Sequence, residues 1–183
     1  GSEMCIRDSY PTSEPQLQLR LPTERYYEEE GRAELTPRDF GILMHRVFEN
    51  AATTDEIYMA IEAMTQDGVL DEKEAPRLRE LVEKALADPV TAEWFGGRWQ
   101  VVRNENEIIL PGSGTTRRPD RVMTDGERAV VVDYKFGDRE TARHRKQIRE
   151  YLRLLRQMGY TRTEGYLWYV RLGRTERVEE KED

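Results

Sequence analysis

Two aspartates and one lysine have residue types and a spacing that suit metal-assisted hydrolysis. Asp120 precedes an Asp125-Gly126 pair, and Asp133 and Lys135 follow it. Asp-Gly between apolar runs indicates a β-hairpin, because both central residues of a type I′ turn need a positive φ. With these two residues as the loop, Asp120 would be a diagonal neighbour of Asp133 at about 7–8 Å, and Lys135 would share their face. Two carboxylates at that distance can bind one divalent cation.

These residues need a sheet and flanking helices to hold them in place. A helix is predicted to begin at Thr36-Pro37, where Thr36 is suited to the N-cap and Pro37 to the first turn. From Trp99 onward the apolar pattern changes to that of strands. Further helices are predicted over 54–66, 73–87 and 139–158, and strands over 100–110, 117–124, 129–136 and 164–170. Periodicity alone therefore gives a mixed α/β class.

Polar side chains at helical spacing flank the predicted hairpin. His45 and Glu49 are four residues apart on the first helix, and Gln147 and Tyr151 are four apart on the last. Residues four apart on a helix lie on the same face, so each pair can act together. Glu107, on the strand before the hairpin, is a further acidic candidate.

These motifs occur in an order that resembles a known family. Pro-Asp at 119–120 with Asp-Tyr-Lys at 133–135 resembles the signature of the PD-(D/E)XK nuclease superfamily. The Gly-x-x-x-His-x-x-x-Glu pattern at 41–49 and Gln-x-x-x-Tyr at 147–151 resemble the RecB-like nuclease domain at the C-terminus of UvrD/AddA-type helicase-nucleases. The resemblance covers about residues 36–172. It implies a restriction-endonuclease-like α/β core, a mixed central sheet of about four strands flanked by helices, with an N-terminal helical segment.

The resemblance and the chemistry of the side chains together assign roles. Hard cations such as Mg²⁺ or Mn²⁺ prefer oxygen ligands, stabilise charge on a scissile phosphate and lower the pKa of an attacking water. A lysine beside them can orient that water. The predicted catalytic residues are Asp120, Asp133 and Lys135, and the predicted metal ligands are His45, Asp120 and Asp133, with Glu49 and Glu107 as further candidates. The residues predicted to bind DNA are Gln147, Tyr151, Arg143 and Lys146.

Each role has a plainer structural alternative. Asp133 and Lys135 could form a surface ion pair of little energetic value. An aspartate at a strand start, such as Asp120, is often only a cap. For Asp133 this alternative is weak, because it lies between valines and a tyrosine and a buried carboxylate without a partner is costly. A lone histidine beside core positions, such as His45, is more often structural, and Gln147 could simply pack.

The predicted function is a metal-dependent DNA nuclease, exonucleolytic at DNA ends, within a larger helicase-nuclease of DNA repair or recombination. The expected partners are DNA, a helicase motor in the same full-length chain and a second helicase-nuclease subunit. One alternative is a catalytically weak or inactive DNA-binding or docking module of the same fold. Another is a stand-alone nuclease or junction resolvase.

Composition narrows the class of protein. The single cysteine, Cys5, excludes a four-cysteine zinc or iron–sulfur site within one chain. No apolar run approaches the roughly 18 residues of a membrane helix, and no signal sequence opens the chain, so we expect no membrane partner and a cytoplasmic location. We expect an extended or disordered lead-in with cloning-derived residues over 1–35, the nuclease domain over 36–173 and an acidic tail over 174–183.

Charge is distributed unevenly along the chain. The formal net charge is −7, which is unusual for a protein that binds DNA. Residues 139–158 nevertheless hold seven basic and two acidic side chains. Because this predicted helix follows Asp133 and Lys135, it would gather positive charge near the site. An ordinary solvated helix face is the alternative.

Overall fold

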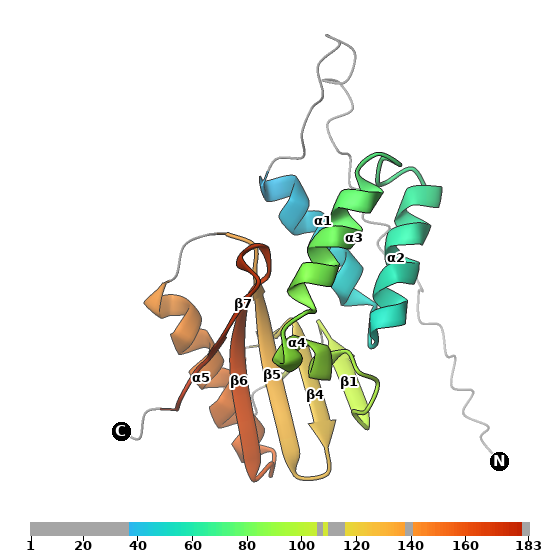
Figure 1. The fold of residues 1–183 in the computed structure, drawn as a ribbon. Helices are drawn as coiled ribbons and strands as arrows, with labels where there is room; N and C mark the ends of the chain where they lie inside the picture. Colours follow the sequence, from blue (N-terminus) through green and yellow to red (C-terminus); the bar gives the residue numbers. More distant parts are fainter. Residues whose placement is uncertain (1–36, 106–107, 110–115, 138–140, 181–183) are drawn as a thin grey trace, which may run out of the picture. The chain divides into compact units, whose positions relative to one another are not determined.

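The computed structural model describes residues 37–105, 108–109, 116–137 and 141–180 (Figure 1). The chain divides into residues 1–34 and residues 35–183, and all that follows concerns the second unit. The lead-in expected over 1–35, the N-cap expected at Thr36 and the acidic candidate Glu107 lie outside the described residues. The helices are α1 (Pro37–Glu49), α2 (Thr54–Gln66), α3 (Ala75–Ala85), α4 (Pro89–Trp94) and α5 (Ala142–Gln157), with a 3-10 turn, η2 (Val170–Leu172). The strands are β1 (Val101–Asn104), β2 (Ile108–Ile109), β3 (Thr116–Arg117), β4 (Arg121–Asp125), β5 (Arg128–Lys135), β6 (Arg162–Tyr169) and β7 (Arg174–Arg177).

A mixed sheet of five strands in the order β1-β4-β5-β6-β7 forms the centre of this unit (Figure 1). Strands β5 and β6 are parallel and joined through α5, whereas the other neighbours are antiparallel. Strands β2 and β3 form a separate two-stranded sheet. The predicted α/β class is confirmed, as a mixed sheet flanked by helices with an N-terminal helical segment. Within the described residues, no helix has both the length and the apolarity to span a bilayer.

Alternating side chains give the central sheet two buried faces. Val130, Val132 and Trp168 pack in one core with residues of α1 to α4. Val131 and Leu167 face the other way and pack against α5. This alternation explains the dense valine run of β5, because a strand covered by helices on both faces is apolar along its length. The site residues of β5 are thereby held at one end of a rigid sheet.

A glycine allows α5 to lie close to β6. A Cβ added at Gly165 would lie 2.4 Å from Ile148 Cγ2 and 3.2 Å from both δ carbons of Leu152. Real Cβ atoms do not approach other carbons so closely, so only glycine fits between this helix and this strand. This close approach sets the separation between α5 and β6.

Several predicted boundaries are wrong. The strand predicted over 100–110 is β1 and β2 separated by a break at Glu105, whose φ is +53°. The strand predicted over 117–124 is likewise divided, into β3 and β4. Helix α4 was not predicted, because Pro89 suggests the end of a helix, whereas here it follows the N-cap Asp88. The acidic tail predicted from residue 174 is wrong for its first part, because β7 pairs with β6.

The hairpin is also shifted from its predicted register. Asp125 pairs with Arg128, so the loop is Gly126-Glu127. Gly126 has a φ of +57°, and Glu127 is not among the residues with positive φ, a combination that suits a type II′ turn rather than type I′. Continuing the pairing of Arg121 with Val132 brings Asp120 level with Asp133, closer than the diagonal relation that the sequence predicted.

Candidate active site

Polar side chains from both helical layers meet the sheet at the end where β1 stops, β4 starts and β5 stops. His45 comes from α1 on one face, and Gln147 comes from α5 on the other. Glu105 follows β1, Asp120 precedes β4, and Asp133 and Lys135 close β5. Strand ends offer irregular backbone and room for side chains, which a strand centre buried on both faces does not.

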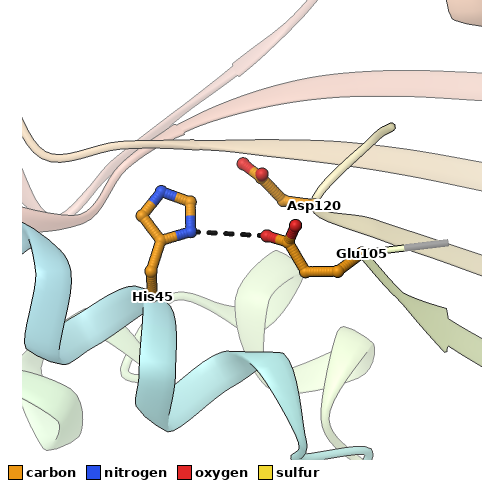
Figure 2. Close-up of side chains that lie close together, drawn as sticks. All are labelled: His45, Glu105 and Asp120. Atoms are coloured by element: carbon orange, nitrogen blue, oxygen red, sulfur yellow. Dashed lines mark ion pairs between the residues drawn. The ribbon is translucent and has the colours of Figure 1, made fainter. Parts of the chain in front are cut away.

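Three donor atoms, one each from His45, Glu105 and Asp120, lie within 4.8 Å of one another. Figure 2 shows the three side chains converging, with an ion pair between His45 Nδ1 and Glu105 Oε1 at 3.5 Å. The backbone ties two of these residues together, because Glu105 N donates to Asp120 O at 3.0 Å. One imidazole and two carboxylates are a donor set that suits Mn²⁺ or Mg²⁺. The three residues therefore fit a divalent metal ion.

Asp120 is the most strongly perturbed carboxyl of the site. Burial and the neighbouring Asp133 raise the pKa of Asp120 to about 8, although a backbone hydrogen bond opposes the shift. That bond runs from Tyr134 N to Asp120 Oδ2 at 2.5 Å. Two carboxylates that are buried close together cannot both ionise without a compensating cation. The site thus favours the arrival of positive charge.

The surroundings of His45 favour its neutral imidazole. Its ring packs against Phe136 at 4.8 Å and Tyr134 at 6.1 Å between centroids, and burial lowers its pKa, although Glu105 and Asp133 oppose the shift. A neutral imidazole keeps one nitrogen lone pair for a metal. Gly41, one turn earlier on α1, allows this packing, since a Cβ there would lie 3.3 Å from the Phe136 side chain.

Asp133 is buried and has two partners of its own. Lys135 Nζ forms an ion pair with its Oδ2, and Gln147 Nε2 donates to its Oδ1 at 3.3 Å. The side chain of Lys135 is largely shielded from solvent, at 19 % exposure, so this is not the solvated surface pair of the structural alternative. Asp133 also acts electrostatically on both His45 and Asp120.

The residues predicted to bind DNA lie on α5 in two different environments. Arg143 and Lys146 are exposed near its beginning. Tyr151 is buried at 1 % exposure in the core beneath α5, and its hydroxyl receives a hydrogen bond from Gln147 Nε2 at 2.9 Å. Gln147 therefore joins this tyrosine to Asp133. Arg117 meets the same helix through an ion pair with Glu150 at 3.0 Å.

Sequence reasoning missed Glu105. Its carboxylate forms ion pairs with His45 and, at 2.8 Å, with Arg118 Nε, which also donates a hydrogen bond to the backbone carbonyl of Glu105 at 2.7 Å. Glu49, the acidic partner considered for the imidazole, is instead exposed at the last position of α1. The available signal was the alternation Asn-Glu-Asn-Glu at 104–107, from which the other glutamate was chosen.

Comparison with protein-family models identifies the family of the chain. A family model described as the PD-(D/E)XK nuclease superfamily matches residues 16–183. No curated protein matches the chain. The match includes the five strands of the central sheet and every residue of the candidate site.

Proposed function

Because the chain belongs to the PD-(D/E)XK nuclease superfamily, whose members are divalent-metal nucleases, we propose that it hydrolyses DNA phosphodiester bonds with Mg²⁺ or Mn²⁺. The observation that carries the proposal is the convergence of His45, Glu105 and Asp120 beside the buried Asp133–Lys135 pair. A metal-free site with this much negative charge is costly, and a bound cation would relieve the cost.

The proposed ligands are His45, Asp120 and Asp133, with Glu105 as an additional carboxylate. A divalent ion bound by them would stabilise charge on the phosphate and lower the pKa of the attacking water. Lys135 Nζ forms an ion pair with the Asp133 carboxylate and so places an ammonium group directly beside the proposed metal ligands. With a divalent ion bound to that carboxylate, the Lys135 ammonium would be able to hold the attacking water and to offset charge in the transition state.

Helix α5 is proposed to meet the DNA backbone. Arg143 and Lys146 are exposed at the end of α5 that carries Gln147, which itself contacts Asp133. Lysine and arginine side chains placed in this way bind phosphates without reading sequence. Tyr151 would act through Gln147, because its ring is buried. The net charge of −7 favours weak affinity for DNA by the chain alone, and so delivery of the strand by another module or chain.

We further propose that cleavage is exonucleolytic and belongs to DNA-end processing in a larger helicase-nuclease of repair or recombination. The supporting feature is the combination of His45 on the first helix with the Gln147–Tyr151 pair on α5, which resembles RecB-like domains. A nuclease of this kind should degrade linear DNA from its ends and leave covalently closed circles intact.

The decisive experiment is a cleavage assay with Mg²⁺, Mn²⁺ or EDTA on four DNA substrates. Two are linear and end-labelled, one single-stranded and one blunt duplex. The other two are covalently closed circles, one single-stranded and one duplex, which are labelled internally. The wild type is compared with Asp133→Asn and Lys135→Met, and with Asp125→Asn as a matched control, because Asp125 is exposed on the same hairpin.

We expect metal-dependent loss of linear DNA in the wild type and in Asp125→Asn, and none in the two site variants. A wild type that cuts nothing with either metal would refute the nuclease. Equal cutting of linear and circular DNA would refute the exonucleolytic mode alone.

A further inference from the structure

Arg121, next to Asp120 in the sequence, is an arginine with no exposed surface. Its Nη1 donates to Ala51 O at 2.7 Å and to Asn104 Oδ1 at 3.1 Å. Its Nη2 donates to the carbonyls of Ala52 and Trp94, each at 2.7 Å. The guanidinium also lies over the Phe95 ring, 4.0 Å from the centroid. Three of its four hydrogen-bond acceptors are backbone carbonyls.

These carbonyls belong to segments that would otherwise be separate. Ala51 and Ala52 connect α1 to α2, and Trp94 is the last residue of α4. Carbonyls at the ends of helices lack intrahelical partners and carry partial negative charge. They meet the desolvation cost of the guanidinium, whose burial lowers its pKa. The planar fork of arginine can bind several such acceptors at once, which lysine cannot do.

Asn104 completes this arrangement from the neighbouring strand. It pairs with Arg121 in the register of β1 and β4. Its Nδ2 donates to Ala51 O at 3.1 Å, the same carbonyl that Arg121 uses. Asn104 precedes Glu105, and Arg121 follows Asp120. Glu105 and Asp120 are therefore each next in sequence to a residue that donates a hydrogen bond to Ala51 O, just after the end of α1.

Helix α1 carries the third member of the site. His45 lies six residues before Ala51, whose carbonyl accepts the hydrogen bonds from Arg121 and Asn104, a separation of less than two turns of helix. A shift of α1 along the sheet would move the imidazole relative to Glu105 and Asp120 and break their common approach within 4.8 Å. The relative placement of the three donors therefore depends on the contacts made at the end of α1.

We propose that Arg121 is a positioning residue, which sets the imidazole of His45 against the carboxylates of Glu105 and Asp120 and so controls affinity for the divalent metal ion. This inference rests on the proposed function, because it takes the three side chains as metal ligands. Arg121 itself contacts neither the ion nor the DNA. Its effect passes through the backbone of α1 and of the two strand ends.

The test is metal binding by calorimetry, with Ca²⁺ and with Mn²⁺, on protein free of DNA. The variants are Arg121→Lys, which keeps the charge and loses the fork, and Asn104→Ala, a milder change at the same carbonyl. Changes outside the ligand shell weaken metal affinity about 10- to 100-fold, and we expect a loss in that range for Arg121→Lys and a smaller one for Asn104→Ala. Excess metal should restore cleavage in both.

A destabilised control separates positioning from simple loss of fold. Val82→Ala opens a cavity in the core beside α3, where Val82 is fully buried and far along the chain from the site. It should lower the free energy of unfolding without changing metal affinity. The inference would be overturned if Arg121→Lys bound metal as tightly as the wild type. It would also be overturned if Val82→Ala lost as much metal affinity as Arg121→Lys.

The outcomes for the wild type distinguish this inference from the proposed function. A wild type that binds metal but cuts no DNA refutes the nuclease and leaves the positioning role intact. A wild type that binds neither ion refutes both. Cleavage in Arg121→Lys that excess metal does not restore would also contradict a role through metal affinity.

Discussion

The pKa of Asp120 makes metal binding depend on pH in a specific direction. Burial and Asp133 raise this pKa to about 8, so at neutral pH the metal-free carboxyl carries a proton. A cation that binds there must displace that proton. The neighbouring His45 has no proton to lose on metal binding at pH 7 and above, because burial lowers its pKa from the ordinary value of 6.5. One proton should therefore be released for each ion bound.

The size of this effect on metal affinity follows from the difference between the working pH and the pKa of Asp120. At pH 6, two units below a pKa of about 8, about one Asp120 in a hundred is ionised. Displacing the proton then costs about 2.7 kcal/mol, since each pKa unit corresponds to about 1.4 kcal/mol. Metal affinity should rise about tenfold per pH unit up to pH 8 and then level off.

Calorimetric titration of the DNA-free protein with Mg²⁺ at pH 6, 7, 8 and 9 measures this dependence. Repeating each titration in two buffers of different ionisation enthalpy counts the protons released. We expect close to one proton at pH 6 and 7 and close to none at pH 9. Asp125→Asn is the matched control, because it removes an exposed carboxyl from the same hairpin, and its curve should follow that of the wild type.

A metal affinity that stays constant from pH 6 to pH 9, with no proton released, would refute the reasoning.

The stability of the metal-free protein provides a second test of the raised pKa of Asp120. A carboxyl whose folded pKa lies above its unfolded value stabilises the fold at low pH, and that contribution is lost as pH rises through the folded pKa. Relative to Asp120→Asn, the wild type should lose stability between about pH 4 and pH 8 in urea unfolding.

Three further predictions concern single substitutions. Gly165→Ala places a Cβ 2.4 Å from a side-chain carbon of α5 and should lower the free energy of unfolding by about 1–3 kcal/mol, measured by urea denaturation. Gln147→Leu removes the hydrogen bond to Asp133; kcat should fall about tenfold with little change in melting temperature, since hydrogen bonds outside the ligand shell orient ligands. Glu105→Gln should weaken calorimetric Mn²⁺ binding about tenfold, whereas Glu49→Gln, an exposed change on α1, should leave it unchanged.

The sequence predicted the fold class and the central motifs because both rest on strong local patterns. The valine run of β5 is typical of a strand buried on both faces, and the apolar stripe of α5 has a clear helical period. The hairpin signal at Asp125-Gly126 was sound, but the glycine occupies the first loop position rather than the second. The predicted and observed hairpin registers are shifted by two residues, and a shift by an even number leaves each side chain on the same face of the sheet. The shared face of Asp120 and Asp133 was therefore predicted correctly, whereas the distance between them was not.

Glu105 was beyond the reach of pattern reasoning for a physical reason. The prediction of one continuous strand over 100–110 assumes that side chains alternate regularly between its two faces. Under that assumption the acidic candidate was Glu107, not Glu105. The actual chain breaks at Glu105, where the backbone adopts a φ of +53° that non-glycine residues rarely adopt. Contacts with residues distant in the sequence hold this conformation: the hydrogen bond from Glu105 N to Asp120 O, and the hydrogen bond and the ion pair with Arg118. No local signal encodes them.

The same contrast explains why Arg121 attracts no notice in the sequence. An arginine beside an aspartate in a polar segment suggests a solvated ion pair, and its neighbours give no hint of burial. Its acceptors lie 17 to 70 residues away, at places that only the packed structure brings together. A buried guanidinium tolerates little displacement, since each lost carbonyl leaves a buried donor unpaired. In the proposed positioning role, Arg121 would couple the packing of the surrounding helices to the positions of Asp120 and Glu105, and the helical layer would then contribute to metal binding as well as to the core.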